Sequence, residues 1–234
     1  MCCGPTSPRF AHCFACRTVA RRLNLPLTPV IPVQLCPVTG PLYAALMGYK
    51  ESSIDEVRRQ FAGRVRDLFS RFLAVHRACL VAAIGGGVDV VLAVPSTSRP
   101  GGASLEGVDG LPELVLSGLG GQACWVPAAL QRASGAIGHM HPNRHAFAVP
   151  RSARRVIGTS RVLLLDDTYV SGSRAQSAAA ALRLSGAQSV VVVPAGRVLR
   201  PERFVTHAAF IAAQPVSEGH RSRCVVGQAG AGRR

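Results

Sequence analysis

Apolar residues recur every three or four positions between residues 54 and 77, which predicts an amphipathic helix. Its apolar positions are Ile54, Val57, Phe61, Val65, Leu68 and Phe72. The opposite side holds the arginines Arg58, Arg59, Arg64, Arg66 and Arg71. A run of charges on one side of a helix is typical of a solvated face.

Three continuous aliphatic runs predict buried strands at residues 88–94, 161–166 and 187–196. The last two runs flank residues 173–186, which predict a helix ending at Gly186. A strand, a helix and a second strand in this order indicate a parallel sheet covered on both faces. We therefore predict an α/β protein with a central, mostly parallel sheet flanked by helices.

The segment between the first two strands has weaker patterns. Residues 111–117 predict a short helix, and residues 123–130 predict another strand. Residues 131–155 are basic and contain Gly, Pro and His without periodicity, so we expect a long functional loop there.

The two ends of the chain differ in composition from its middle. Residues 1–40 are rich in Cys and Pro, which predicts a small appendage of extended edge structure and turns. Residues 214–234 are rich in Gly, Ser and Arg, and we expect them to form a disordered basic tail. The main domain is thus expected to span residues 41–213.

The chain carries a formal net charge of +15, and Lys50 is its only lysine among 27 basic residues. This charge favours an anionic partner such as a nucleic acid or a phosphorylated metabolite, and compositional bias explains it equally well. No apolar run reaches the length of a bilayer span, and the first ten residues lack a hydrophobic signal core. We therefore expect a cytoplasmic protein.

Two adjacent acids, Asp166 and Asp167, follow the aliphatic run of the second strand. Open α/β sheets bind ligands at this end of their strands. The next residues form a Gly/Ser loop that leads into a helix, whose first backbone amides favour phosphate. A ribose 5-phosphate fits this pattern, with its hydroxyls on the acids and its phosphate in the loop. In the alternative reading Asp167 caps the helix and Asp166 is an exposed acid at the strand end.

The stretch "VLLLDDTYVSGSR" resembles the phosphoribosyl pyrophosphate (PRPP) signature of type I phosphoribosyltransferases. The resemblance implies that fold, with Asp166 and Asp167 as the catalytic acids. It assigns the 5′-phosphate to a loop formed by Thr168, Tyr169, Val170, Ser171, Gly172, Ser173 and Arg174. Val170 and Arg174 stand where the family pattern has threonines.

A second stretch, "VDVVLAVPSTSRPGG", resembles the pyrophosphate loop of the same family. The resemblance assigns Ser96, Thr97, Ser98 and Arg99 to the pyrophosphate end of PRPP, which binds together with Mg²⁺. Small polar residues beside an arginine also suit an anion-binding turn. An ordinary turn before Pro100 is the alternative.

Within this family the chain resembles the ComF-type proteins, which are linked to competence for DNA uptake and carry an N-terminal zinc ribbon. "LYAALMGYKES" and "HPNRHAFAV" carry this likeness, which covers roughly residues 40–200. The first stretch contains Lys50, a candidate ligand of the pyrophosphate. The second contains Arg144, a weaker candidate on a loop that the family places over the active site.

Eight cysteines are present, and Cys13 and Cys16 form a C-x₂-C pair that suits zinc. Without a secretory signal, metal binding or free thiols are favoured over disulfides. Cys36 stands where a second pair would begin, but Thr39 occupies the position of its partner. The remaining candidates for a fourth ligand are His12, Cys2 and Cys3. A degenerate or absent zinc site is favoured over a complete one.

Two functions remain open from the sequence. The first is an enzyme that transfers the phosphoribosyl group of Mg-PRPP to an unknown acceptor and releases pyrophosphate. The second is a non-catalytic protein that binds PRPP or a nucleotide, or that serves DNA uptake. No segment outside residues 53–195 is recognisable as a site for an acceptor base.

Overall fold

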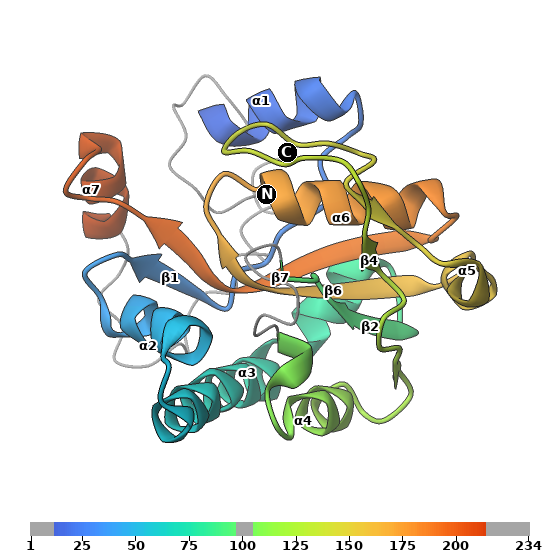
Figure 1. The fold of residues 1–234 in the computed structure, drawn as a ribbon, viewed down its shortest axis with the longest axis horizontal. Helices are drawn as coiled ribbons and strands as arrows, with labels where there is room; N and C mark the ends of the chain where they lie inside the picture. Colours follow the sequence, from blue (N-terminus) through green and yellow to red (C-terminus); the bar gives the residue numbers. More distant parts are fainter. Residues whose placement is uncertain (1–11, 97–104, 214–234) are drawn as a thin grey trace, which may run out of the picture.

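A five-stranded parallel sheet forms the centre of the computed structural model, which describes residues 12–96 and 105–213 (Figure 1). The strand order is β1-β7-β6-β2-β3. The strands are β1 (Gln34–Pro37), β2 (Val90–Ala93), β3 (Cys124–Trp125), β6 (Arg161–Tyr169) and β7 (Ser189–Leu199). The predicted α/β class is therefore confirmed.

Helices cover both faces of the sheet (Figure 1). One face carries α1 (Phe14–Leu23), α5 (Arg151–Ile157), α6 (Ser173–Leu184) and a hairpin of β4 (Gln131–Arg132) and β5 (Phe147–Ala148). We call this set the α6 layer. The other face carries α2 (Pro41–Glu51), α3 (Asp55–Ile84), the 3₁₀ turn η1 (Leu105–Gly107) and α4 (Leu111–Gly118), which we call the α3 layer. Helix α7 (Val205–Ala212) follows β7 at the β1 edge of the sheet.

The continuous aliphatic runs are explained by burial of both faces of the strands. Leu163 and Leu165 of β6 pack against the α3 layer, and Val162 and Leu164 pack against the α6 layer. The α3 layer fills its core with large side chains such as that of Phe69, which is fully buried. Helix α6 buries mostly alanine and serine side chains. Helices α3 and α6 therefore differ in the size of the side chains that they bury.

The predicted elements of the central segment are present, with several changes in length. Strand β6 continues past the acids to Tyr169, since Thr168 and Tyr169 still pair with β7. Helix α3 continues to Ile84, because apolar positions recur to its end, and it stops at Gly85 with a φ of 83°. The short helix predicted at residues 111–117 is confirmed as α4. The strand predicted at residues 123–130 is limited to the two residues of β3.

Residues 12–40 are joined to the sheet rather than set apart from it. Helix α1 contacts α6, and Val30 bridges Val192 just before β1 pairs with β7 at the sheet edge. The expected extended edge structure is therefore present, and α1 is an addition to it. Residues 1–11 lie outside the described part of the chain, as does the tail predicted at residues 214–234.

The prediction of a long loop at residues 131–155 is wrong in part. The segment contains the two strands of the hairpin and the start of α5. Ala146, Phe147 and Val149 are buried against the α6 side of the sheet. The sequence obscured this because the strands have only two residues each and are separated by Gly and Pro.

Within residues 12–96 and 105–213, none of the helices combines the length and the apolar character needed to cross a bilayer.

Candidate functional site

The two acids lie where the connections of the sheet diverge. From β6 the chain passes through α6 to β7 on one side, and from its neighbour β2 it passes through α4 to β3 on the other. Ligands of open α/β sheets bind at such a switch point, outside the carboxyl ends of the strands. Asp166 and Asp167 occupy this position on β6. The amide of Val94 donates to the carbonyl of Leu165 at 2.8 Å, so the chain leaves β2 beside the acids.

Both acids are buried and are held by cations from the two layers. Nη2 of Arg174, on α6, lies 2.5 Å from Oδ1 of Asp166 and 2.8 Å from Oδ1 of Asp167. Lys50, on α2, forms an ion pair with Oδ2 of Asp167. The hydroxyl of Tyr49 donates to the same oxygen at 3.2 Å. The sequence proposed Lys50 as a ligand of the pyrophosphate; in this structure its ammonium group pairs with Asp167, and Arg174, assigned to the 5′-phosphate loop, faces both acids.

The two carboxyl groups have opposite pKa shifts. Burial raises the pKa of Asp166 to about 6, against the opposing effect of Arg174. Burial acts on Asp167 in the same direction, but Arg174 and Lys50 outweigh it and lower its pKa below the usual range. Burial, followed by the charge of Asp167, raises the pKa of Tyr49, which therefore stays a neutral donor. The pair thus combines a carboxylate with a group that takes up a proton near pH 6.

The predicted 5′-phosphate loop forms the turn between β6 and α6. Gly172 has a φ of 84°, a left-handed conformation that favours glycine, and it precedes the first residue of α6. The hydroxyls of Ser171 and Ser173 lie 3.1 Å apart, and both side chains are buried at the start of the helix. The first amides of an α-helix lack partners within the helix, so this turn offers donors to an anion. Thr168 is half-buried and donates to Oδ1 of Asp167 at 2.9 Å, whereas Val170 is exposed.

The Tyr169 side chain is buried in the core of the α6 layer, and its hydroxyl end lies against Gly172, where an added Cβ atom would be only 2.2 Å from the hydroxyl oxygen. The guanidinium of Arg197, a buried residue of β7, lies over its ring at 5.1 Å from the centroid. The same guanidinium donates to the carbonyls of Tyr169, at 3.0 Å, and Val170. Arg197 therefore holds the backbone at the start of the loop and places a buried positive charge next to it.

The loop between β4 and β5 packs against the turn. The amide of Met140 donates to Oγ of Ser171 at 3.3 Å, and the amide of Asn143 donates to Oγ of Ser177 at 2.9 Å. Arg144, the weaker candidate, is exposed next to Asn143. The loop expected to cover the site therefore contacts the turn between β6 and α6, and α6 itself, through its backbone amides.

The predicted pyrophosphate loop is described only at its first residue. Ser96 is half-buried just beyond the end of β2. Thr97, Ser98 and Arg99 lie outside the described residues.

The three cysteines of the proposed zinc site lie on opposite faces of the sheet. Cys13 and Cys16 are buried in the core of the α6 layer, and Cys36 is buried in the core of the α3 layer. Burial raises the pKa of Cys36 to about 12, which disfavours the thiolate that zinc requires. No group of three His, Cys, Asp or Glu suited to a metal occurs in the described part of the chain.

Two residues of the site were missed in the sequence. Tyr49 directly precedes Lys50, and a buried aromatic hydroxyl in an otherwise apolar helix needs a polar partner. Arg197 interrupts the aliphatic run of β7, and a charge in a buried strand is the signal that marks it.

Searches against protein-family models, curated proteins and solved structures find no match for this chain.

Proposed function

We propose that this chain is a type I phosphoribosyltransferase-like protein that binds Mg-PRPP or a related ribose 5-phosphate. It would transfer the phosphoribosyl group to an acceptor and release pyrophosphate. The observation that carries the proposal is the buried pair Asp166 and Asp167 at the switch point, followed directly by the turn at the start of α6. Carboxylates accept hydroxyls and helix starts favour phosphate, so one ribose 5-phosphate satisfies both.

In the proposed ligand-free state, the cations Lys50 and Arg174 neutralise the two acids. Binding exchanges part of these ion pairs for contacts with the ligand. Arg174 lies at the start of α6, so it can turn from the acids to the pyrophosphate or the 5′-phosphate. Its arginine character compensates for the missing threonine of the family pattern.

In the transfer step the bond between C1 of the ribose and the pyrophosphate oxygen breaks, and pyrophosphate leaves with the electron pair. A nucleophilic atom of the acceptor forms the new bond to C1 and loses its proton to solvent. Positive charge develops at C1 between these events, and the nearby carboxylate of Asp167 stabilises it. The contribution of the protein is orientation and electrostatic stabilisation.

Magnesium enters this proposal as part of Mg-PRPP. Mg²⁺ is commonly bound by one or two carboxylates together with substrate phosphates and water. The oxygens of Asp166 and Asp167 fit that requirement, either directly or through water. When bound, the ion supplies charge neutralisation for the leaving pyrophosphate.

Calorimetric titration with PRPP and Mg²⁺ tests the proposal. Saturable binding by the wild type is expected, with loss of binding in the Asp166→Asn/Asp167→Asn variant. Asp67→Asn, which removes an exposed carboxylate from α3, is the matched control and should bind normally. Absence of PRPP binding by the wild type would overturn the proposal.

The charge of the α6 layer favours a second candidate, a non-catalytic protein that binds nucleic acid during DNA uptake. Residues 12–33, 126–160 and 173–188 of this layer contain no Asp or Glu. Seven of their arginines are exposed: Arg21, Arg22, Arg132, Arg144, Arg151, Arg154 and Arg155. Such a surface attracts the phosphates of a nucleic acid strand. Turnover of PRPP would exclude the non-catalytic version.

A further inference from the structure

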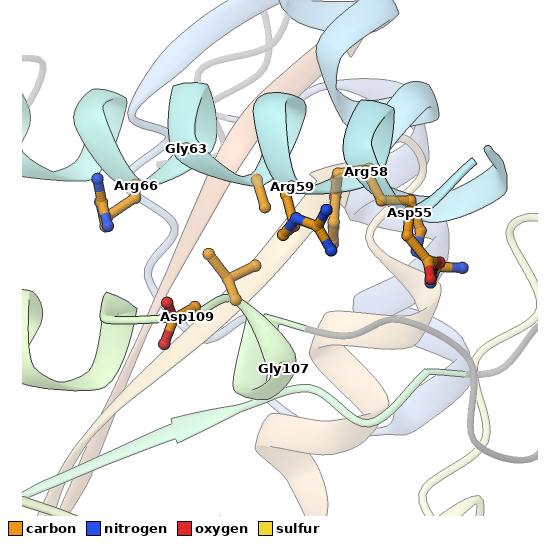
Figure 2. A pocket seen from close by; sticks show the side chains of 10 residues that line it. Asp55, Arg58, Arg59, Gly63, Arg66, Gly107 and Asp109 are labelled. Atoms are coloured by element: carbon orange, nitrogen blue, oxygen red, sulfur yellow. Dashed lines mark hydrogen bonds and ion pairs between the residues drawn. The ribbon is translucent and has the colours of Figure 1, made fainter. Parts of the chain in front are cut away.

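A cavity of about 410 Å³ lies between α3 and the end of η1 with the two residues that follow it (Figure 2). Cavities of this size accept small molecules. Its α3 wall consists of Asp55, Arg58, Arg59, Ala62, Gly63 and Arg66. Their spacing of three and four residues places them on one side of the helix, the side that the sequence alone marked as a solvated face.

Two small residues create the space. A Cβ atom at Gly63 would meet no atom within 4 Å, and Ala62 lies beside it on the cavity wall. Glycine within a helix is about 1 kcal/mol less favourable than alanine, and no close neighbour requires it here. A larger side chain at position 63 would occupy the cavity instead.

Two of the arginines on the cavity wall form exposed ion pairs with neighbouring acids of α3. Arg58 and Arg59 pair with Asp55 and Glu56, but all four side chains are exposed, and such pairs contribute little. Their guanidinium groups can therefore turn to a ligand.

Arg66 is half-buried, and no hydrogen bond or ion pair to its side chain is found among residues 12–96 and 105–213. Arg66 and Asp109 lie toward one end of the cavity and Arg58 toward the other (Figure 2). Ala62 and Val108 are apolar members of the lining.

Tyr49 joins this cavity to the acid pair. It lines the cavity, and its hydroxyl donates to Asp167 at 3.2 Å. Turn η1 in turn contacts β2 and β6, the two strands that form the switch point. A molecule in the cavity therefore lies next to the site proposed for the ribose.

We infer that the cavity binds a small amphipathic acid, with its carboxylate or phosphate held by Arg66, while Arg58 and Arg59 add positive charge toward the other end of the cavity (Figure 2). Its apolar body packs on Ala62 and Val108. Arginine forks match both oxyanions, and three arginines outnumber the aspartates Asp55 and Asp109. That this acid is the acceptor of the transferred group rests on the proposed function. The ligand class does not, because it follows from the cavity alone.

Ligand-observed NMR on the full chain tests the inference with benzoate, phenyl phosphate and the neutral benzamide as probes. Gly63→Leu fills the cavity, with Gly63→Ala as its matched control. Arg66→Gln removes one cation, and Arg71→Gln, an exposed position of α3 outside the cavity, is its control. Thermal unfolding of each variant shows whether α3 is intact.

Benzoate or phenyl phosphate is expected to bind, and the tighter of the two identifies the preferred oxyanion. Binding should be lost in Gly63→Leu and weakened about tenfold in Arg66→Gln, the effect of one charge-assisted hydrogen bond. Both controls should bind as the wild type does. Equal binding of benzamide, or unchanged binding in folded Gly63→Leu and Arg66→Gln, overturns the inference.

Failure of this inference is distinguishable from failure of the proposed function. If PRPP binds but no probe does, the proposal of a cavity ligand is wrong and the proposed function still stands. Probe binding without PRPP binding leaves an acid-binding cavity and removes its role as the acceptor site.

Discussion

The two faces of the sheet differ in both packing and charge. In the α6 layer, helix α6 packs mostly small side chains against the strands, and segments 12–33, 126–160 and 173–188 contain no acid. The α3 layer packs large side chains and exposes the acids Glu51, Asp55, Glu56, Asp67, Asp109 and Glu113. The acid pair lies where the layers meet and takes Arg174 from one and Lys50 from the other. The site is therefore complete only when both layers are in place on the sheet.

The largest effect is expected from truncation in the core of the α3 layer. Phe69→Ala should lower the free energy of unfolding by about 3–5 kcal/mol, because it leaves a cavity among large side chains. Urea denaturation measures this change. A loss below about 1 kcal/mol would contradict the close packing of this layer.

Removal of the cation from the α6 layer should have the next largest effect. Arg174→Met leaves buried carboxylates with Lys50 alone, and we expect a loss of about 3 kcal/mol at neutral pH. Arg174→Lys retains the charge and should recover part of this loss. An unchanged unfolding midpoint in Arg174→Met would show that the ion pairs to Asp166 and Asp167 are not formed.

The pH dependence of the free energy of unfolding tests the acid pair, which lies where the two layers meet. Folding raises the pKa of Asp166 to about 6, so between pH 4 and pH 6 the unfolded chain loses this proton while the folded chain keeps it. The contribution of Asp166 to stability therefore falls as the pH rises through this window, by about 3 kcal/mol at most. Asp166→Asn should remove the fall.

Urea titrations at pH 4 and pH 7 measure this fall as the difference in the free energy of unfolding between Asp166→Asn and the wild type. Asp167 acts in the opposite direction at lower pH, because its pKa is depressed and its contribution is lost on acidification. An identical pH dependence in Asp166→Asn and the wild type would contradict the assignment.

Enlargement of a small side chain tests the α6 layer. Ala179 is fully buried between α6 and the sheet, and Ala179→Leu should lower the free energy of unfolding by about 1–3 kcal/mol through overpacking. Leu184→Ala, at an exposed position of the same helix, is the control and should change stability by about 0.5 kcal/mol or less. Tolerance of the larger side chain would show that this face is not closely packed.

The smallest effect concerns the charged surface of the α6 layer. Arg151→Gln/Arg155→Gln on α5 should weaken binding to single-stranded DNA and reduce the salt slope by about 1.4, or 0.7 for each lost phosphate contact. Arg64→Gln/Arg71→Gln on α3 should leave both unchanged. Fluorescence anisotropy over a range of salt concentrations measures the slopes. Equal slopes for the two variants would show that the α6 layer contacts DNA phosphates no more than α3 does.

The sequence predicted the elements that are continuous and local. Strand β6, helix α6 and strand β7 follow one another with short connections, and their aliphatic runs identified them. Helix α2 and helix α1 were not predicted, because their apolar periodicity is short and Pro and Gly lie close to their ends. The pairing of β1 with β7 joins residues that are far apart in the chain, and local patterns do not contain that information.

The same distinction applies to the site. The acids and the turn after them are consecutive in sequence, so their pattern was visible. Tyr49 and Arg197 reach the site from α2 and β7, and only the packing of these elements brings them to Asp167 and Tyr169. The cavity was invisible for the same reason, since a row of arginines has the same sequence pattern whether it faces solvent or an opposing wall.

The position of Tyr49 has a consequence for thermodynamic coupling. Its single hydroxyl contacts Asp167 while its side chain forms part of the cavity wall, so a ligand that shifts it at one location alters the other. Linkage then requires the effect to be reciprocal: the factor by which a cavity ligand changes affinity at the acids equals the factor by which occupation of the acids changes affinity in the cavity. Tyr49 would thereby supply the coupling free energy between the two ligands, and their cooperation could be measured from either side.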